Sequence, residues 1–434
     1  EIFAADVEQD LAYAYLSDTK ALEQQLHERI VARYQLDREK VLNQPLPTPG
    51  DLLGRDQVLV QYFTTRKWRV DRESADPIAD ARLYAIVWRK GAAPVLRGLG
   101  DPRRLLVGGE DMVAALQTRD RSTGEGRGLL VQASKRAFSR LHDGLIAPID
   151  ADIAGAKTVF IVPDGQLFAL PFSLLEDPAG RLLEERFTLR LLTEPEALYR
   201  AVEDRALPSE GRVVLAGGID YAKGEEAGAM PLPGTLREVE AIGKVLSGPG
   251  LRIETLSGAA VGEAALRERM TGATVAHLAT HGAYGSAKNG GASNVDTLWQ
   301  SEVILARSGD TRAMRRDEKD GRLYAFELMG WDLSGLDLLV LSACETGRGD
   351  EAFVGGLRGL PTAANLVGAR RSLLTLWPVA DDGTADFMVR FYEHLKDGQA
   401  YAEALRSTRR DAIEGRIPTA QDPLVWAAFV LFEN

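Results

Sequence analysis

The sequence has a single cysteine, Cys344, among its 434 residues. One thiol excludes a disulfide bond within the chain, which suits a reducing compartment such as the cytoplasm. No run of 18 apolar residues suggests a membrane-spanning helix, and the N-terminus lacks the basic and apolar segments of a secretory signal. We therefore expect a cytoplasmic protein without a membrane partner. The first residue is Glu1, so we also expect a trimmed chain or a fragment of a longer protein.

Basic tracts are scarce as well. The chain has 63 acidic and 52 basic residues, for a net charge of −11. Binding to a phosphate backbone relies on clustered Lys and Arg, so we expect no direct contact with nucleic acid. No nucleotide or flavin fingerprint is present, and we expect no cofactor. With 45% hydrophobic residues the chain can bury a large core, and its length indicates two or three domains.

The first fifty residues are predicted to be helical. Apolar residues recur every four positions from Leu22 to Tyr34, and the pattern ends in three prolines at positions 45, 47 and 49. From residue 51 the pattern changes to short β-rich runs bounded by Gly and Pro. These runs are residues 57–63, 82–88, 95–99 and 158–162, with a helical stretch at about 134–141 before the last one.

Beyond a linker at about residues 205–211, strands and helices alternate. The predicted strands are residues 213–216, 251–256 and 275–279, and the predicted helices are residues 236–246 and 263–270. Thr235 and Glu238 have the spacing of a capping box for the first of these helices. This alternation is typical of a mostly parallel sheet with helices on both faces, whose ligand crevice lies outside the carboxyl ends of the strands.

A thiol and an imidazole follow two of the apolar runs. Cys344 comes two residues after Leu338–Ser342, and His281 comes two residues after Val275–Ala279. A free thiol has a pKa near 8.5 and needs a base to act as a nucleophile at neutral pH. The histidine precedes the cysteine by 63 residues (344 − 281). That order and spacing are near those of caspases, about 50 residues, although two residues rather than one separate Cys344 from the following glycine.

Several strings around these residues resemble the CHAT domain, a bacterial branch of the caspase and separase clan (clan CD). They are Ala279-Thr280-His281-Gly282, residues 341–347 (LSACETG), residues 376–381 (LWPVAD), residues 426–431 (WAAFVL), Pro233-Gly234-Thr235 with Glu238, and Val162-Pro163-Asp164-Gly165 with Leu170-Pro171-Phe172. The resemblance covers about residues 55–434. It implies an α/β caspase-like fold in three parts. Residues 1–50 would be a helical segment, as at the end of the repeat array of a TPR-CHAT protein, residues 51–207 an inactive caspase-like half, and residues 208–434 the catalytic domain.

The resemblance also implies a mechanism. Cys344 would attack the scissile carbonyl and His281 would transfer the proton, while the backbone N–H groups of Gly282 and Cys344 would stabilise the oxyanion. In separase-like relatives an acidic residue in the position of Asp381 receives a basic P1 side chain. We therefore expect Asp381 to receive the P1 side chain in the S1 pocket and Trp377 to form a wall of that pocket.

Each of these residues also has a structural interpretation. Asp381 fits a surface carboxylate as well as a pocket group, and Trp377 fits the core. His277 lies inside an apolar run and is expected to be structural. His277 and His281 have the spacing of a helical zinc site, but on a strand four residues span about 13 Å, so we expect no metal site. The other imidazoles, His27, His142 and His394, are expected to be solvated.

Residues 285–294 are rich in small residues and residues 308–322 in charged ones. Such a stretch indicates either a solvated loop or a gating or self-processing loop that orders on partner binding.

The sequence thus favours a regulated cysteine endopeptidase that cleaves a protein substrate in a bacterial cytoplasm. An activating protein or ribonucleoprotein complex would act through the N-terminal helices, and relatives of this kind are linked to defence. Two alternatives remain, a peptide-binding or scaffolding module that turns over weakly, and a non-peptide thiol hydrolase or acyltransferase.

Overall fold

The computed structural model describes residues 47–65, 81–102, 136–201, 205–221, 231–284, 301–306, 321–342, 360–377, 379 and 381–434. Contacts divide the chain into two compact units, Glu1–Thr48 and Pro49–Asn434. The predicted N-terminal helices lie outside the described residues. The features below belong to the second unit.

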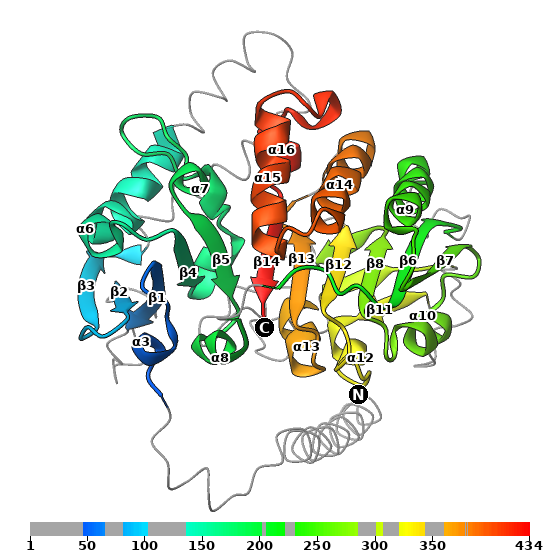
Figure 1. The fold of residues 1–434 in the computed structure, drawn as a ribbon, viewed down its shortest axis with the longest axis horizontal. Coiled ribbons are helices and arrows are strands. Elements are labelled where there is room, and N and C mark those ends of the chain that lie inside the picture. The colour runs from blue at the N-terminus through cyan, green and yellow to red at the C-terminus, as the bar shows by residue number, and fades with distance from the viewer. Residues whose placement is uncertain are drawn as a thin grey trace, which may run out of the picture. The chain divides into compact units, whose positions relative to one another are not determined.

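An eleven-stranded sheet forms the centre of this unit (Figure 1). In spatial order the strands are β3 (Val95–Gly100), β2 (Arg82–Arg89), β1 (Gln57–Thr65), β4 (Thr158–Val162), β5 (Thr188–Leu192), β14 (Phe429–Glu433), β13 (Arg371–Thr375), β12 (Leu338–Ser342), β8 (Val275–Ala279), β6 (Gly211–Ile219) and β7 (Leu251–Gly258). The pairs β3–β2, β2–β1 and β14–β13 are antiparallel and the other neighbouring pairs are parallel. The predicted mostly parallel α/β fold is therefore confirmed.

The burial of the strands explains their sequences. Every residue of β8, β12, β13 and β14 is buried, because helices cover both faces of the sheet there. Such strands are continuous apolar runs rather than alternating ones. The edge strand β3 is largely exposed by contrast, and its sequence includes Arg97 and two glycines.

Helices flank both faces of the sheet. The chain moves outward along the sheet from β6 to β7 through α9, and then back from β7 to β8 through α10. Because both crossovers are right-handed, these opposite directions place α9 and α10 on opposite faces of the sheet. Helix α14 packs against α9 and α15 packs against α14, and α12 and α13 lie on the side of α10 (Figure 1). None of the described helices is long and apolar enough to cross a membrane.

The helices have the following bounds. Those beside the second half of the sheet are α9 (Pro233–Leu246), α10 (Glu263–Met270), α12 (Ala325–Leu328), α13 (Leu360–Leu366), α14 (Asp381–Lys396), α15 (Tyr401–Ile413) and α16 (Pro423–Trp426). Those of the first half are α3 (Pro49–Leu52), α6 (Asp150–Ile153), α7 (Leu183–Arg186) and α8 (Leu198–Ala201), and residues 136–145 are also helical. Short 3-10 helices occupy Ala147–Ile149, Gly165–Ala169, Phe172–Leu174, Pro195–Ala197 and Pro418–Ala420.

The direction of the strands reverses between β13 and β14, both of which belong to the predicted second half. Strand β14 is antiparallel to β13 but parallel to β5, so β1, β4 and β5 run opposite to β8, β12 and β13. The turn after β4, which contains Asp164, therefore opens at the edge of the sheet opposite to the one where β8 and β12 end. The division of the chain at about residue 207 stays a prediction, since both halves share this one sheet.

The two halves meet at a seam, defined here as the pairing of β5 with β14. Only Leu191 and Leu192 of β5 pair in register with β14. Buried ion pairs reinforce this short contact. Arg190 of β5 forms two hydrogen bonds of 2.5 Å with the carboxylate of Glu433, and that carboxylate lies 3.7 Å from Arg371 of β13. Arg190 from the first half and Arg371 from the second half thus share the carboxylate of Glu433. These ion pairs fix the register of the seam.

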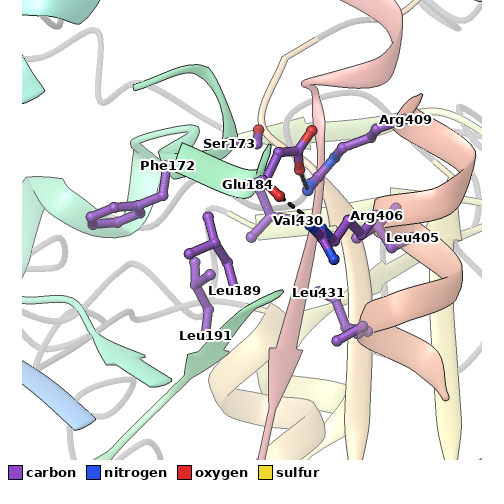
Figure 2. Close-up of a pocket in the computed structure, with 11 residues that line it drawn as sticks. Phe172, Ser173, Glu184, Leu189, Leu191, Leu405, Arg406, Arg409, Val430 and Leu431 are labelled. Carbon is purple, nitrogen blue, oxygen red and sulfur yellow. Dashed lines mark hydrogen bonds and ion pairs between the residues drawn. The ribbon is translucent and has the colours of Figure 1, made fainter. Parts of the chain in front are cut away.

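Helix α15 bridges the seam on one face of the sheet. Figure 2 shows Arg406 and Arg409 of α15 directed toward Glu184 of α7. Arg409 donates to the Glu184 carboxylate at 2.7 Å, and Arg406 donates to the Glu184 carbonyl at 2.7 Å. Burial raises the pKa of Glu184, and Arg409 opposes that rise. Beside these contacts is a hollow of about 430 Å³, part of it open to solvent, which is lined by apolar residues of β5, α15 and β14 and by the polar side chains of Ser173, Glu184, Arg406 and Arg409.

Candidate functional site

The carboxyl ends of β8 and β12 lie side by side. The register pairs Ala279 with Ser342, and the N–H of Thr280 donates to the carbonyl of Ser342 at 3.2 Å. His281 follows its strand by two residues and is described by the structure. Cys344 lies outside the described residues, two positions after Ser342.

The backbone of His281 is fixed by a second, small sheet. Its strands are β9 (Gly282–Tyr284), β10 (Ser301–Ile304) and β11 (Arg322–Tyr324), in the order β11-β10-β9. The N–H of Ile304 donates to the carbonyl of His281 at 2.8 Å. The sequence analysis did not identify β10 and β11, which lie within or beside the stretch expected to be a long loop. Residues 285–300 and 307–320 of that stretch are outside the described residues.

The imidazole of His281 is half-buried and lies against Tyr221. The two ring centroids are 5.1 Å apart and the ring planes are inclined by 57°. Tyr221 is also hydrogen-bonded through its hydroxyl to Oγ1 of Thr280, at 2.9 Å. Sequence reasoning missed Tyr221. A signal was present, because Tyr221 stands two residues after β6, as His281 and Cys344 stand two residues after β8 and β12.

Gly282 presents its backbone N–H away from β10. Gly282 pairs with Val303 in an antiparallel register, and the bond from Ile304 N–H to the His281 carbonyl flanks that pair. This is the pattern of a non-hydrogen-bonded pair, whose own N–H points away from the partner strand. Strand β9 is at the edge of the small sheet, so among the described strands no ladder uses the Gly282 N–H.

Asp381 and Trp377 follow β13, the strand beside β12. Asp381 is the first residue of α14. Trp377 is 1% exposed, and its indole N–H donates to the carbonyl of Leu424 at 2.8 Å. That is the environment of a core residue. Contact of Trp377 with a substrate stays a prediction.

His277 has a structural environment. It is fully buried, with Nε2 at 2.9 Å from Oε1 of Glu238 on α9 and Nδ1 at 3.3 Å from the hydroxyl of Tyr392 on α14. Both ring nitrogens therefore have protein partners. Within the described residues no group of three His, Cys, Asp or Glu side chains is placed to hold a metal ion.

The predicted capping box was wrong. Helix α9 begins at Pro233, earlier than expected, and the Thr235 hydroxyl donates to the carbonyl of Leu232 at 2.7 Å and accepts from the N–H of Gly218 at 2.9 Å. Glu238 is turned into the core to meet His277 instead of bonding the start of the helix. The spacing of Thr235 and Glu238 is compatible with a helix cap and with a buried contact to His277. The packing of α9 against β8 favours the buried contact.

The expected solvation of two other imidazoles was also wrong. His142 is 4% exposed, and His394 is 9% exposed with Nε2 at 2.9 Å from Asp411. Both lie on helix faces that pack against neighbouring elements, which the local sequence did not reveal. His27 lies outside the described residues.

Comparison with known proteins agrees with this geometry. The model of the CHAT domain family matches residues 135–434. Two crystal structures of the separase–securin complex of Saccharomyces cerevisiae, at 2.6 and 3.0 Å resolution, match with TM-scores of 0.50 and 0.51 and 10% and 9% identity. Each match covers 89% of this chain and 30% of the other. A third structure, described as a protease, has a TM-score of 0.39 and 11% identity, and covers 70% of this chain and 68% of the other.

The sequence matches no curated protein. At these identities the separase structures show a shared fold, and this chain spans less than a third of their length. The family model, by contrast, matches more than half of the chain and therefore shows the family. The matched residues include β8, β12 and β13, the strands that the candidate site residues follow. This chain belongs to the CHAT domain family and has the fold of the caspase and separase clan of proteases.

Proposed function

We propose that this chain is a cysteine endopeptidase in which Cys344 is the nucleophile and His281 its proton-transfer partner. The observation that carries the proposal is the register of β8 with β12. Ala279 and Ser342 are paired on adjacent parallel strands, and each candidate follows its member of this pair by two residues.

Covalent geometry limits where the two side chains can be. Two residues of chain span at most about 7 Å, so the Cα atoms of His281 and Cys344 are each within that distance of a paired strand end. Adjacent strands lie about 4.8 Å apart. Chains that leave the sheet in the same direction would keep the imidazole and the thiol within side-chain reach.

In the proposed reaction the Cys344 thiolate forms a bond to the scissile carbonyl carbon, and the carbonyl oxygen becomes an oxyanion. His281, having accepted the thiol proton, donates it to the leaving amine as the C–N bond breaks. Water then adds to the thioester carbonyl, with its proton passing to His281, and the thiolate leaves to regenerate the enzyme. The chemistry needs no group beyond these side chains and water.

The oxyanion would be stabilised by the N–H groups of Gly282 and Cys344. Support comes from the small sheet, because the Gly282 N–H points away from β10 and is one residue from His281. A fixed N–H donor that is not used in a ladder needs no reorganisation when negative charge develops. The small sheet thereby holds both His281 and the proposed donor.

The proposed S1 residue is Asp381. It begins α14, which follows β13, and β13 is the strand next to β12 on the side away from β8. A carboxylate at that sheet edge fits an arginine or lysine at P1. Asp381→Asn is expected to lower kcat/KM for Arg peptides by about 100-fold and to leave Leu peptides unaffected, since a charged hydrogen-bonded pair is worth roughly 3 kcal/mol.

The matched control is Asp382→Asn. The neighbouring Asp382 side chain is 83% exposed and pairs with Arg237 at 3.2 Å, so its charge is already screened and compensated. Equal turnover of Arg and Leu peptides by the wild-type protein would exclude this assignment of Asp381.

The experiment that tests the activity is incubation of the wild type, Cys344→Ala and His281→Ala with a diverse peptide library, with cleavage sites located by mass spectrometry. Cuts made only by the wild type would support the proposal and give the P1 preference. Cuts made equally by Cys344→Ala would refute it. If the wild type binds library peptides without cutting them, the chain is a peptide-binding module instead.

A further inference from the structure

We propose that Tyr221 is a positioning residue for His281, which holds the imidazole in one orientation beyond the carboxyl end of β8. The inference rests on the proposed function and adds a residue to its site. It comes from contacts between described residues, and it requires no knowledge of where the Cys344 side chain lies.

A closed set of contacts joins Tyr221 to His281. The Tyr221 ring lies against the imidazole at 5.1 Å, and the Tyr221 hydroxyl is 2.9 Å from Oγ1 of Thr280. That same Oγ1 donates to the carbonyl of Ile304, whose N–H donates to the carbonyl of His281. The backbone of His281 is thus fixed by β10, its ring is supported by Tyr221, and Tyr221 is fixed by the residue that precedes His281.

The imidazole needs such support because its own backbone does not fix the ring. The χ2 torsion of histidine has a broad, roughly two-fold energy profile, so an unsupported ring rotates between orientations. A misplacement of about 1 Å at a reacting group can cost about 100-fold in rate.

The chain contains a second histidine–tyrosine pair that serves as a control. His277 and Tyr392 have ring centroids 5.7 Å apart and the same 57° inclination. That pair is fully buried between β8 and the helices α9 and α14. Two similar ring contacts, one within β8 and one two residues beyond its end, therefore allow a positioning role to be separated from a packing role.

The test compares Tyr221→Leu, Tyr221→Phe and Tyr392→Phe with the wild type. Two rates are measured at pH 7, namely kcat on a peptide selected from the library, and alkylation of the chain's single thiol by iodoacetamide without substrate. We expect Tyr221→Leu to lower kcat by about 10- to 100-fold with KM changed less than threefold, and to slow alkylation by a similar factor. Tyr221→Phe keeps the ring and loses one hydrogen bond, so we expect a fall of about fivefold.

Tyr392→Phe is expected to lower the melting temperature while both rates of the folded protein stay within about twofold of the wild type. The inference is overturned if Tyr221→Leu is folded and alkylates as fast as the wild type, or if Tyr392→Phe lowers both rates as much as Tyr221→Leu. Should Tyr221→Leu not fold, Tyr221→Phe decides: wild-type values of both rates would then overturn the inference.

Failure of the inference and failure of the proposed function give different results. If His281→Ala alkylates as fast as the wild type, the thiol and the imidazole are not a pair, and the proposed function fails with the inference. If His281→Ala is slowed and Tyr221→Leu is not, the dyad stands and only the positioning role of Tyr221 is lost.

Discussion

Replacing Gly282 by proline tests the proposed oxyanion hole at one atom. Proline removes the backbone N–H at position 282. Any other substitution at that position keeps this hydrogen-bond donor. In this protein the substitution breaks no ladder bond, because Gly282 and Val303 form a non-hydrogen-bonded pair. Proline is tolerated on edge strands where its N–H side faces away from the sheet.

The magnitude follows from the number of donors. Two N–H groups are proposed, and loss of one oxyanion-hole donor typically costs about 100-fold in kcat, or about 2.7 kcal/mol. KM is expected to stay within about threefold, since the donor acts on charge that develops only in the transition state. The matched control is Gly282→Ala, which keeps the N–H and adds a Cβ. We expect it to raise KM, because the Cβ obstructs the substrate backbone, and to leave kcat nearly unchanged.

The assay is steady-state cleavage of a peptide selected from the library, together with iodoacetamide alkylation of the thiol. Proline also restricts the conformation of the residue before it, here His281, so a fall in kcat has two candidate causes, displacement of His281 and loss of the donor. Alkylation separates the two effects, because pairing of thiol and imidazole does not use the Gly282 N–H. A Gly282→Pro protein that alkylates at the wild-type rate and has the kcat of Gly282→Ala would refute the assignment of Gly282.

Three further outcomes are expected. Arg190→Met should lower the free energy of unfolding by about 3–5 kcal/mol in urea titrations, because it leaves the buried carboxylate of Glu433 without its main partner. The control Arg97→Met removes an exposed ion pair and should lower that free energy by less than about 1 kcal/mol. Equal losses in the two variants would contradict a stabilising role of the buried pair at the seam. Asp411 is desolvated, but hydrogen bonds from two arginines and a histidine outweigh that effect and lower its pKa. Its contribution to stability is therefore complete above the ordinary aspartate value near 4 and is lost as the pH falls through the lower folded-state pKa. Asp411→Asn should therefore flatten the loss of stability that acid titration produces below about pH 4. Self-processing in residues 285–322 predicts two fragments in the intact mass of incubated wild type and one species for Cys344→Ala.

The sequence predicted most strands and their order along the chain, because a buried strand in a parallel sheet is a continuous apolar run. The segments at residues 158–162, 263–270 and 275–279 begin and end where they were expected. The sequence analysis did not identify β10 and β11, because both strands are short and the apolar run at residues 303–306 stands between stretches rich in small and charged residues. Pairing with β9 gives them their structure.

Side-chain partners were predicted less well than elements. Glu238 was assigned to a helix cap by spacing and lies instead in a buried contact with His277, 39 positions away in sequence. His142 and His394 were expected in solvent and are buried. Glu238 and His394 have their partners on other elements, and His142 is buried by the packing of its helix. No local pattern distinguishes these environments from exposed ones.

The sequence by itself determined the fold class and the candidates for the chemistry. A single cysteine and a histidine, each two residues beyond an apolar run, indicate a thiol dyad without any knowledge of tertiary contacts. The tertiary structure alone decided what surrounds these residues. It set the register of β8 with β12, the direction of the Gly282 N–H, the place of Tyr221 against His281, and the reversal of strand direction between β13 and β14. The physical reason is that apolar periodicity reports whether a residue is buried, while register and ring contacts depend on which distant segments share the same sheet.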